Sequence, residues 1–160
     1  MCSSDLEYLN AGEAFLGYTV TYNAGDSTGG TVPVTGPTAH LVNRLVYVLA
    51  NSGNLMKTAD GNFYLFRGWT KSGGDGTVYI PDNDESHNSF AMPAENVTLV
   101  PVWVQAVASL TVDAGDPVLY AGLQEAFDAA KNASGSSKTV TLRLLPYTGQ
   151  IGRASCRERV

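Results

Sequence analysis

Two runs of β-forming residues, each containing a tryptophan, constrain the fold of this chain more than any other feature. The first run is Phe63–Thr70 and the second is Phe90–Trp103, with a glycine-rich segment after the first. Aromatic and β-branched residues favour strands, while glycine clusters favour turns. We therefore expect the two runs to frame one small β-rich module. Its predicted core residues are Tyr64, Phe66, Trp69, Leu99 and Trp103.

Shorter patterns predict the other strands and turns of this module. Tyr18–Tyr22 alternates apolar and threonine residues, which predicts a half-buried strand. Asn43–Ala50 is an apolar run that favours a strand, although its length also permits a short helix. Asp60 and Gly61 form a dipeptide typical of β-hairpins. A further short strand is predicted at Thr77–Ile80.

Two residues predict irregularities in the framing strands. Gly68 indicates a β-bulge that turns the ring of Trp69 inward. Pro101 lacks an N–H group, so its strand is expected to lie at an edge or to carry a bulge there. We expect Trp103→Ala to unfold residues 17–105, at a cost of about 3–5 kcal/mol for a buried large aromatic side chain.

The pattern changes between Gln105 and Ser109, where we expect a boundary between domains at 17–105 and 106–150. Beyond it, the residues predict a strand, a helix and a strand, which makes the fold mainly β within the α+β class. The helical stripe and the alternating last strand consist of Leu123, Ala126, Phe127 and Ala130, then Val140, Leu142 and Leu144. About 45 residues is marginal for an independent core, so we expect the truncated start of a larger domain.

Composition and charge exclude several classes of partner. The formal charge is −5 at pH 7 and only 16% of residues are charged, so nucleic acid and anionic membranes are not expected partners. No apolar run approaches the roughly 20 residues that span a bilayer, so we expect no membrane insertion. No pattern indicates a cofactor.

Both ends of the chain resemble translated sequencing adapters, at residues 1–6 and 151–160. We therefore expect residues 7–16 to be the end of a preceding segment. Cys2 and Cys156 both fall in the adapter-like segments. Neither a disulfide, a zinc site nor a thiol nucleophile is thus predicted for the remaining chain.

Three motifs in residues 17–105 follow the pattern of a known family. They are the opening Tyr18–Gly25, the aromatic-x-aromatic-x-Gly-Trp pattern of Tyr64–Trp69 with its glycine-rich turn, and Phe90-x-Met-Pro-Ala-x-Asn-Val-Thr-Leu completed by Trp103. On these motifs, the region resembles the Listeria–Bacteroides repeat, an extracellular module related to the B-repeat of internalins. The chain departs from that pattern in its long Thr35–Asn62 region, and at Phe63 and Pro101.

This resemblance implies a β-grasp-like module that occurs in tandem on bacterial surface proteins. It implies a non-catalytic role as a spacer, stalk or adhesion segment, located outside the cell or in the cell wall. Implied partners are neighbouring repeats of the same chain, and host or cell-wall proteins or glycans. The family carries no catalytic residues to transfer.

One short motif is typical of covalent attachment to the cell wall. Leu145, Pro146, Tyr147, Thr148 and Gly149 match the sortase signal Leu-Pro-x-Thr-Gly, which a transpeptidase cleaves between threonine and glycine. The alternative is the end of a strand followed by a turn. Here the motif follows a predicted strand directly, which favours the second interpretation.

Metal and nucleophile chemistry has little support in the sequence. Asp82–Glu85 resembles the start of a calcium loop, but His87 and Pro93 stand where an EF-hand needs glycine and glutamate. His40 and His87 have no second ligand at metal spacing, so surface positions are predicted for both.

A second function remains open at this point. Exposed aromatic side chains that stack on sugars would make this an accessory carbohydrate-binding module of a secreted enzyme. The candidates are Tyr64, Trp69, Tyr79 and Trp103, for which the alternating pattern favours core packing. Separately, residues 120–142 are similar to segments that precede right-handed β-helices in some large surface proteins, which would make 106–150 the start of a β-helix enzyme.

Overall fold

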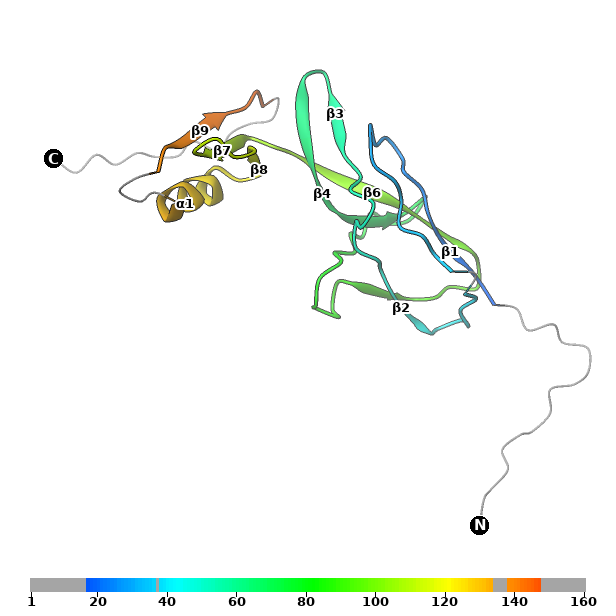
Figure 1. Ribbon diagram of the computed structural model, residues 1–160. Helices are drawn as coiled ribbons and strands as arrows, with labels where there is room; N and C mark the ends of the chain where they lie inside the picture. Colours follow the sequence, from blue (N-terminus) through cyan, green and yellow to red (C-terminus); the bar gives the residue numbers. More distant parts are fainter. Residues whose placement is uncertain (1–16, 37, 134–137, 148–160) are drawn as a thin grey trace, which may run out of the picture.

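The structure, a computed structural model, describes residues 17–36, 38–133 and 138–147. In this part of the chain the fold is mainly β, with nine strands in three sheets and one helix. The strands of residues 17–105 form two sheets, and those of residues 106–147 form the third (Figure 1). Among the described residues, no helix combines the length and the apolar character that crossing a bilayer requires.

The largest sheet has four strands in the order β1-β6-β4-β3. They are β1 (Val20–Tyr22), β6 (Val97–Gln105), β4 (Asn62–Lys71) and β3 (Lys57–Ala59). The β3–β4 hairpin turns at Asp60 and Gly61, whose φ angles are 50° and 76°. Positive φ at both central residues is typical of the tight turn that matches strand twist, so the predicted hairpin is confirmed. The first strand, β1, pairs with the last strand of this sheet, β6, in parallel.

A second sheet of two strands covers the first. It pairs β2 (Leu45–Tyr47) with β5 (Ser89–Ala91), antiparallel. The apolar run Asn43–Ala50 is thus a strand over three of its residues, not a helix. The strand predicted at Thr77–Ile80 is wrong, because only Tyr79 forms an isolated bridge there, to Trp69.

The core lies between these two sheets. Its buried residues come from both, namely Val20, Val46, Val48, Leu55, Trp69, Phe90, Met92, Val97 and Leu99. Of the predicted core residues, Trp69 and Leu99 are fully buried, whereas Phe66 and Trp103 are half-buried against the cluster. Tyr64 is also half-buried but lies outside the cluster, near the β3–β4 hairpin. The alternation of aromatic residues along β4 and β6 therefore predicts more burial than the structure shows for Tyr64, Phe66 and Trp103.

Gly68 lies at an irregularity between β4 and β6. Phe66 pairs with Trp103 and Gly68 pairs with Val102, so Arg67 is an extra residue, as in a β-bulge. A Cβ atom on Gly68 would lie 2.4 Å from the backbone oxygen of Tyr79. Glycine is required there because another backbone approaches too closely for any side chain.

Pro101 lies inside the sheet at a place where one side of β6 has no partner strand. It pairs with Trp69, whose own N–H and C=O both bond to Tyr79 on the opposite side of β4. The Pro101 nitrogen therefore faces the β1 side, where pairing ends at Tyr22 and Leu99. Because no strand pairs with this side of β6 at Pro101, the missing N–H breaks no hydrogen bond between strands. The edge predicted for Pro101 is therefore confined to this part of β6.

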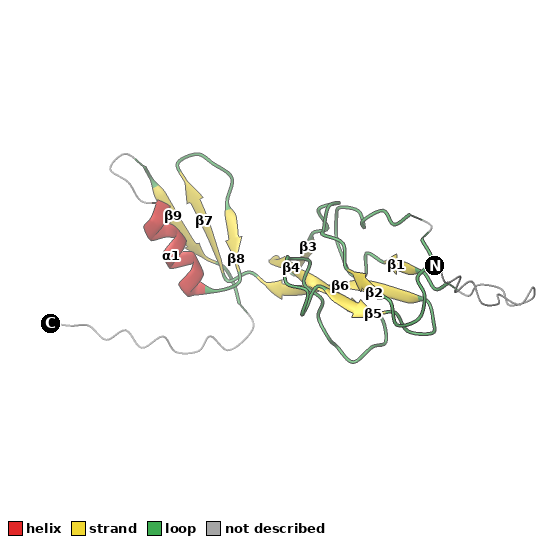
Figure 2. Ribbon diagram, turned by 90° about the horizontal axis from the view of Figure 1, so that it is seen from below, coloured by secondary structure: helices red, strands yellow, loops and turns green. Residues whose placement is uncertain are grey.

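The C-terminal part folds as a three-stranded sheet with a helix on one face. Its strands are β7 (Ala108–Val112), β8 (Val118–Tyr120) and β9 (Val140–Leu144), in the order β8-β7-β9, and α1 (Leu123–Ala133) packs against them (Figure 2). The predicted strand, helix and strand are present, but β8 was missed. Its three residues are too few for a periodic pattern.

Two apolar positions of the C-terminal part are more exposed than predicted. Along α1, Ala126 is buried while Phe127 is 55% exposed. In β9, Leu144 is 63% exposed although it continues the alternation of Val140 and Leu142. The three-stranded sheet is too narrow to cover the whole apolar stripe of the helix. The edge of that stripe, at Phe127, is therefore exposed to solvent.

Candidate functional site

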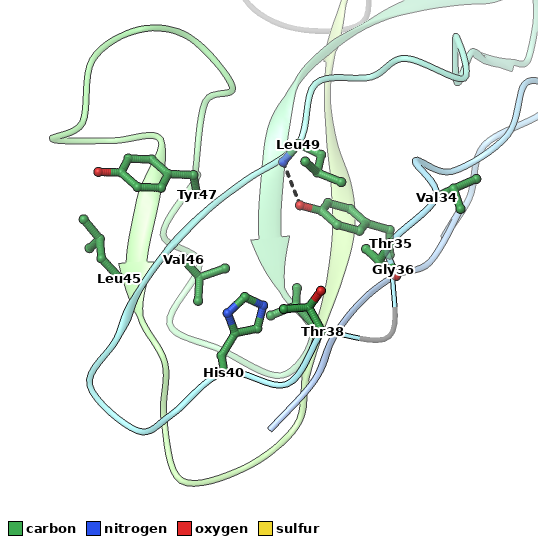
Figure 3. A pocket seen from close by; sticks show the side chains of 11 residues that line it. Val34, Thr35, Gly36, Thr38, His40, Leu45, Val46, Tyr47 and Leu49 are labelled. Carbon is green, nitrogen blue, oxygen red and sulfur yellow. Dashed lines mark hydrogen bonds between the residues drawn. The ribbon is translucent and has the colours of Figure 1, made fainter. Parts of the chain in front are cut away.

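A hollow in the described part of the N-terminal sheets lies between β1, β2 and the loop before β2. Its volume is about 380 Å³ and it is open to solvent. Figure 3 shows Val46 and His40 directed toward each other, while Leu45 and Tyr47 lie on the other side of β2. The lining residues are Val20, Tyr22, Val34, Thr35, Gly36, Thr38, His40, Leu45, Val46, Tyr47 and Leu49. Sequence reasoning missed this hollow, because its lining combines strand residues with an irregular loop.

Hydrogen bonds with the backbone position His40 and Tyr22 in the hollow. His40 lies beside β1 because its N–H and C=O both bond to Tyr18, at 2.8 and 2.9 Å. The hydroxyl of Tyr22 accepts the N–H of Leu49 at 2.7 Å (Figure 3). Burial raises the pKa of Tyr22 above its ordinary value of 10.0, and the bond from Leu49 opposes that effect. Tyr22 is therefore neutral at physiological pH.

The chemistry that this hollow offers is limited to packing and neutral hydrogen bonding. Its lining supplies one imidazole, from His40, and hydroxyls from Thr35, Thr38, Tyr22 and Tyr47. These lining residues include no carboxylate or thiol that would pair with the imidazole for acid–base or nucleophilic work. A small, largely apolar group with one or two polar atoms fits such a surface.

The acidic loop after Pro81 is more organised than the sequence indicates. Backbone N–H groups of Asp84 and Ser86 bond to the carboxylates of Asp82 and Asp84, both at 2.9 Å. His87 lies 3.4 Å from Asp82 and 3.1 Å from Asp84. The His87 side chain is 37% exposed, and it contacts these two aspartates because the turn of the loop brings the three residues together.

The short hydrogen bonds within this loop are those of turns. No group of three or more potential metal-ligating side chains is found in that part of the chain. The pKa of Asp84 lies below its usual range, chiefly because the hydroxyl and N–H of Ser86 bond to its carboxylate, and also because His87 is near. His40 lies apart from this loop, in the hollow described above.

A second polar cluster joins three elements at the far end of the large sheet. The carboxylate of Asp26 forms an ion pair with Lys57 of β3 and accepts the indole N–H of Trp103 at 3.0 Å. The hydrogen bond from Lys57 is the main cause that lowers the pKa of Asp26. Sequence reasoning missed this cluster, because its members are 31 to 77 positions apart. It fastens the loop after β1 to β3 and β6.

The aromatic residues proposed for sugar stacking do not form an open platform. Trp69 is fully buried, and its ring packs edge-on against Tyr22 and Phe66 with centroids 4.6 and 5.0 Å apart. Tyr79 and Trp103 pack against the core and are half-buried. A buried indole cannot stack on a sugar, so the carbohydrate hypothesis loses the residue on which it depended most.

The sortase-like motif begins against the junction of the two parts. The N–H of Leu145 bonds to the carbonyl of Val107 at 2.9 Å, and the side chain of Gln105 donates to the carbonyl of Pro146 at 2.9 Å. Tyr147 is 38% exposed. Thr148 and Gly149 lie outside the described residues, so the structure shows the first three of the five motif residues.

Comparison of the chain with protein-family models, with curated proteins and with solved structures finds no match.

Proposed function

We propose that this chain is a non-catalytic, extracellular module of a bacterial surface protein, which acts as a spacer or stalk segment or in adhesion. The observation that carries the proposal is the parallel pairing of β1 with β6. Because these strands point the same way, the chain enters residues 17–105 beside the start of β6 and leaves at its end. Nine residues of strand separate these points by about 26 Å.

The C-terminal part does not change the distance between the point where the chain enters and the point where it leaves. Its last described residues return to the end of β6, where Leu145 bonds to Val107. The described chain thus begins at one end of the large sheet and finishes near the other end (Figure 1). Modules with such ends extend a chain when they are joined in series, as a spacer requires.

The β-grasp-like assignment and the resemblance to the Listeria–Bacteroides repeat belong to this proposal. A mixed sheet with parallel terminal strands supports the assignment, as does the placement of Trp69, Met92 and Leu99 in one core. The described portion of residues 17–105 contains no helix. The face of the four-stranded sheet is covered by β2, β5 and loops instead. Neighbouring repeats of the same chain are the proposed partners.

Labelling of intact cells tests the proposed location. Antibodies raised against this chain should bind bacteria that carry its gene before their envelopes are permeabilised. Labelling that needs permeabilisation would contradict an extracellular role. A matched antibody against a cytoplasmic protein of the same cells verifies that the envelopes are intact.

A further inference from the structure

The pairing of β1 with β6 has a geometry that matters when a chain is pulled from both ends. Tension on the preceding chain draws β1 toward its own start, whereas tension on the following chain draws β6 toward its end. Since the strands are parallel, these forces act along the strands in opposite directions (Figure 1). The strands must slide past each other, so all hydrogen bonds between them are strained at once.

We propose that β1 and β6 form a mechanical clamp that keeps this module folded under tension applied along the chain. The inference rests on the proposed spacer function, because a spacer between a cell and another surface is pulled from both ends. It goes further by naming the bonds that resist the pull. The clamp consists of Thr19–Asn23 on one side and Asn96–Leu99 on the other.

Hydrogen bonds continue beyond the three paired residues of each strand. Pairing runs from Val20 with Val97 to Tyr22 with Leu99. At one end, the N–H of Val97 donates to the carbonyl of Thr19 at 2.9 Å. At the other end, the N–H of Asn23 donates to the carbonyl of Leu99 at 2.8 Å. These bonds run across the strands, perpendicular or slanted to the pull.

Asn96 extends the clamp with its side chain. Its amide oxygen accepts the backbone N–H of Thr19 at 2.9 Å and the hydroxyl of Thr19 at 3.2 Å. In this way the side chain replaces a backbone acceptor one position before β6 begins. The hydroxyls of Thr21 and Thr98 add a side-chain bond at 3.2 Å on the exposed face.

Core packing opposes sliding from the other face. Val20, Val97 and Leu99 are 8%, 5% and 0% exposed and belong to the buried cluster. A shift of one residue would turn these side chains to the solvent face, so β1 must move by two residues before a new register is possible. Sliding therefore breaks the ladder and exposes the core together.

Within residues 17–105, the clamp is the shorter of the two ladders that hold β6. On its other side, β6 pairs with β4 from Leu99 to Gln105, over most of its length. The β1–β6 ladder has three register pairs. Rupture under tension is therefore expected to begin at β1, and residues of this ladder should set the force.

Single-molecule pulling of the full chain in two geometries tests the clamp. Both variants carry Cys156→Ser and use Cys2 as the first anchor. The second anchor is Asp116→Cys, in the turn after β7, for shear, or Glu95→Cys, before β6, for peeling. Both positions are exposed. In the peeling geometry the force enters β1 and β6 at the same end of the ladder, so its bonds break one after another.

We expect a rupture force several-fold higher in the shear geometry than in the peeling geometry. Asn96→Ala should lower the shear force and leave the peeling force nearly unchanged, and the exposed loop change Asn83→Ala should alter neither. Thr21→Val, which removes the hydroxyl bonds of Thr21 to Thr98 and to the carbonyl of Val97, is a milder second variant if Asn96→Ala does not fold. Forced unfolding reports the rate of unfolding, so equilibrium stability is measured in parallel.

Equal forces in the two geometries would overturn the clamp. A shear force unaffected by both Asn96→Ala and Thr21→Val would overturn the assignment of these bonds. Either of these two pulling results would leave the proposed spacer function standing, provided that the antibody labels intact cells. Loss of that labelling with a strong shear force would leave the clamp standing and remove the spacer function.

Discussion

At the scale of single residues, the two framing tryptophans have unequal surroundings. Trp69 is fully buried, and its indole N–H donates to the carbonyl of Leu49 at 2.8 Å. Trp103 is half-buried at the other end of the sheet, where it contacts Phe66 with ring centroids 5.9 Å apart. The expectation of full burial for Trp103 is thus corrected, because β6 extends beyond the area that β2 and β5 cover.

Alanine replacement should separate these two tryptophans. Trp69→Ala is expected to lower the free energy of unfolding by about 3–5 kcal/mol, since it removes a large buried side chain. Trp103→Ala should cost roughly half as much, because part of its ring already contacts water. Urea denaturation of both variants measures the difference. Equal losses would mean that the far end of β6 is as tightly packed as the core.

Tyr22 provides a pH-dependent prediction. Burial raises its pKa in the folded chain, so the unfolded chain ionises first as pH rises above 10.0. The stability that this group contributes is complete below pH 10.0 and is lost as pH rises through the raised pKa of the folded state. Tyr22→Phe removes this contribution, so its free energy of unfolding should fall less steeply with pH.

The measurement is urea denaturation of both proteins from about pH 8 to about pH 11, across the ordinary tyrosine pKa. Near neutral pH the variant should be less stable by about 1 kcal/mol, because Leu49 loses its hydrogen-bond acceptor. Tyr47 and Tyr79, whose pKa values are also raised, titrate equally in both proteins. Parallel alkaline curves would contradict the role assigned to Tyr22.

At the scale of elements, the contacts of the segment after β9 make the two interpretations of the sortase-like motif testable. Leu145 and Pro146 are bonded to the residues that join β6 to β7. A transpeptidase must bind its signal as a free, extended strand. The contacts of Leu145 and Pro146 therefore compete with the enzyme in the folded chain.

Sortase cleavage should be much slower in the folded chain than in an isolated peptide of residues 143–152. Gln105→Ala removes one of the two contacts and should raise the cleavage rate of the folded chain. Gln124→Ala, in α1 and away from the motif, is the matched control. Mass spectrometry of the products with an added amine nucleophile gives the rates. Equal rates for chain and peptide would favour a genuine sorting signal.

At the scale of the whole molecule, entry and exit at opposite ends of β6 predict how copies of this chain join. Copies of residues 17–147 fused in series should increase the maximum dimension by about 26 Å or more per copy. Small-angle X-ray scattering of one, two and three copies measures this increase. A dimension that stays constant as copies are added would show that the copies fold back on one another.

Local patterns predicted much of this architecture correctly. The mainly β class, the hairpin at Asp60 and Gly61, the bulge at Gly68 and the helix at Leu123–Ala133 all follow from residues close together in the sequence. These features depend on backbone preferences and short-range periodicity, which the side chains themselves carry. The repeat resemblance, the division at residue 105 and the cellular location stay predictions.

Other features depend on residues that only the tertiary structure brings together. The parallel pairing of β1 with β6 joins positions 77 apart, and the Asp26 cluster and the hollow around His40 likewise combine distant segments. The sequence by itself determined most of the longer strands, the hairpin turn and the helix, and that Trp69 lies in a core. Only the tertiary structure decided which strands are neighbours and which aromatics stay half-exposed. The reason is physical, because burial and pairing are set by contacts between distant segments, which local periodicity does not specify.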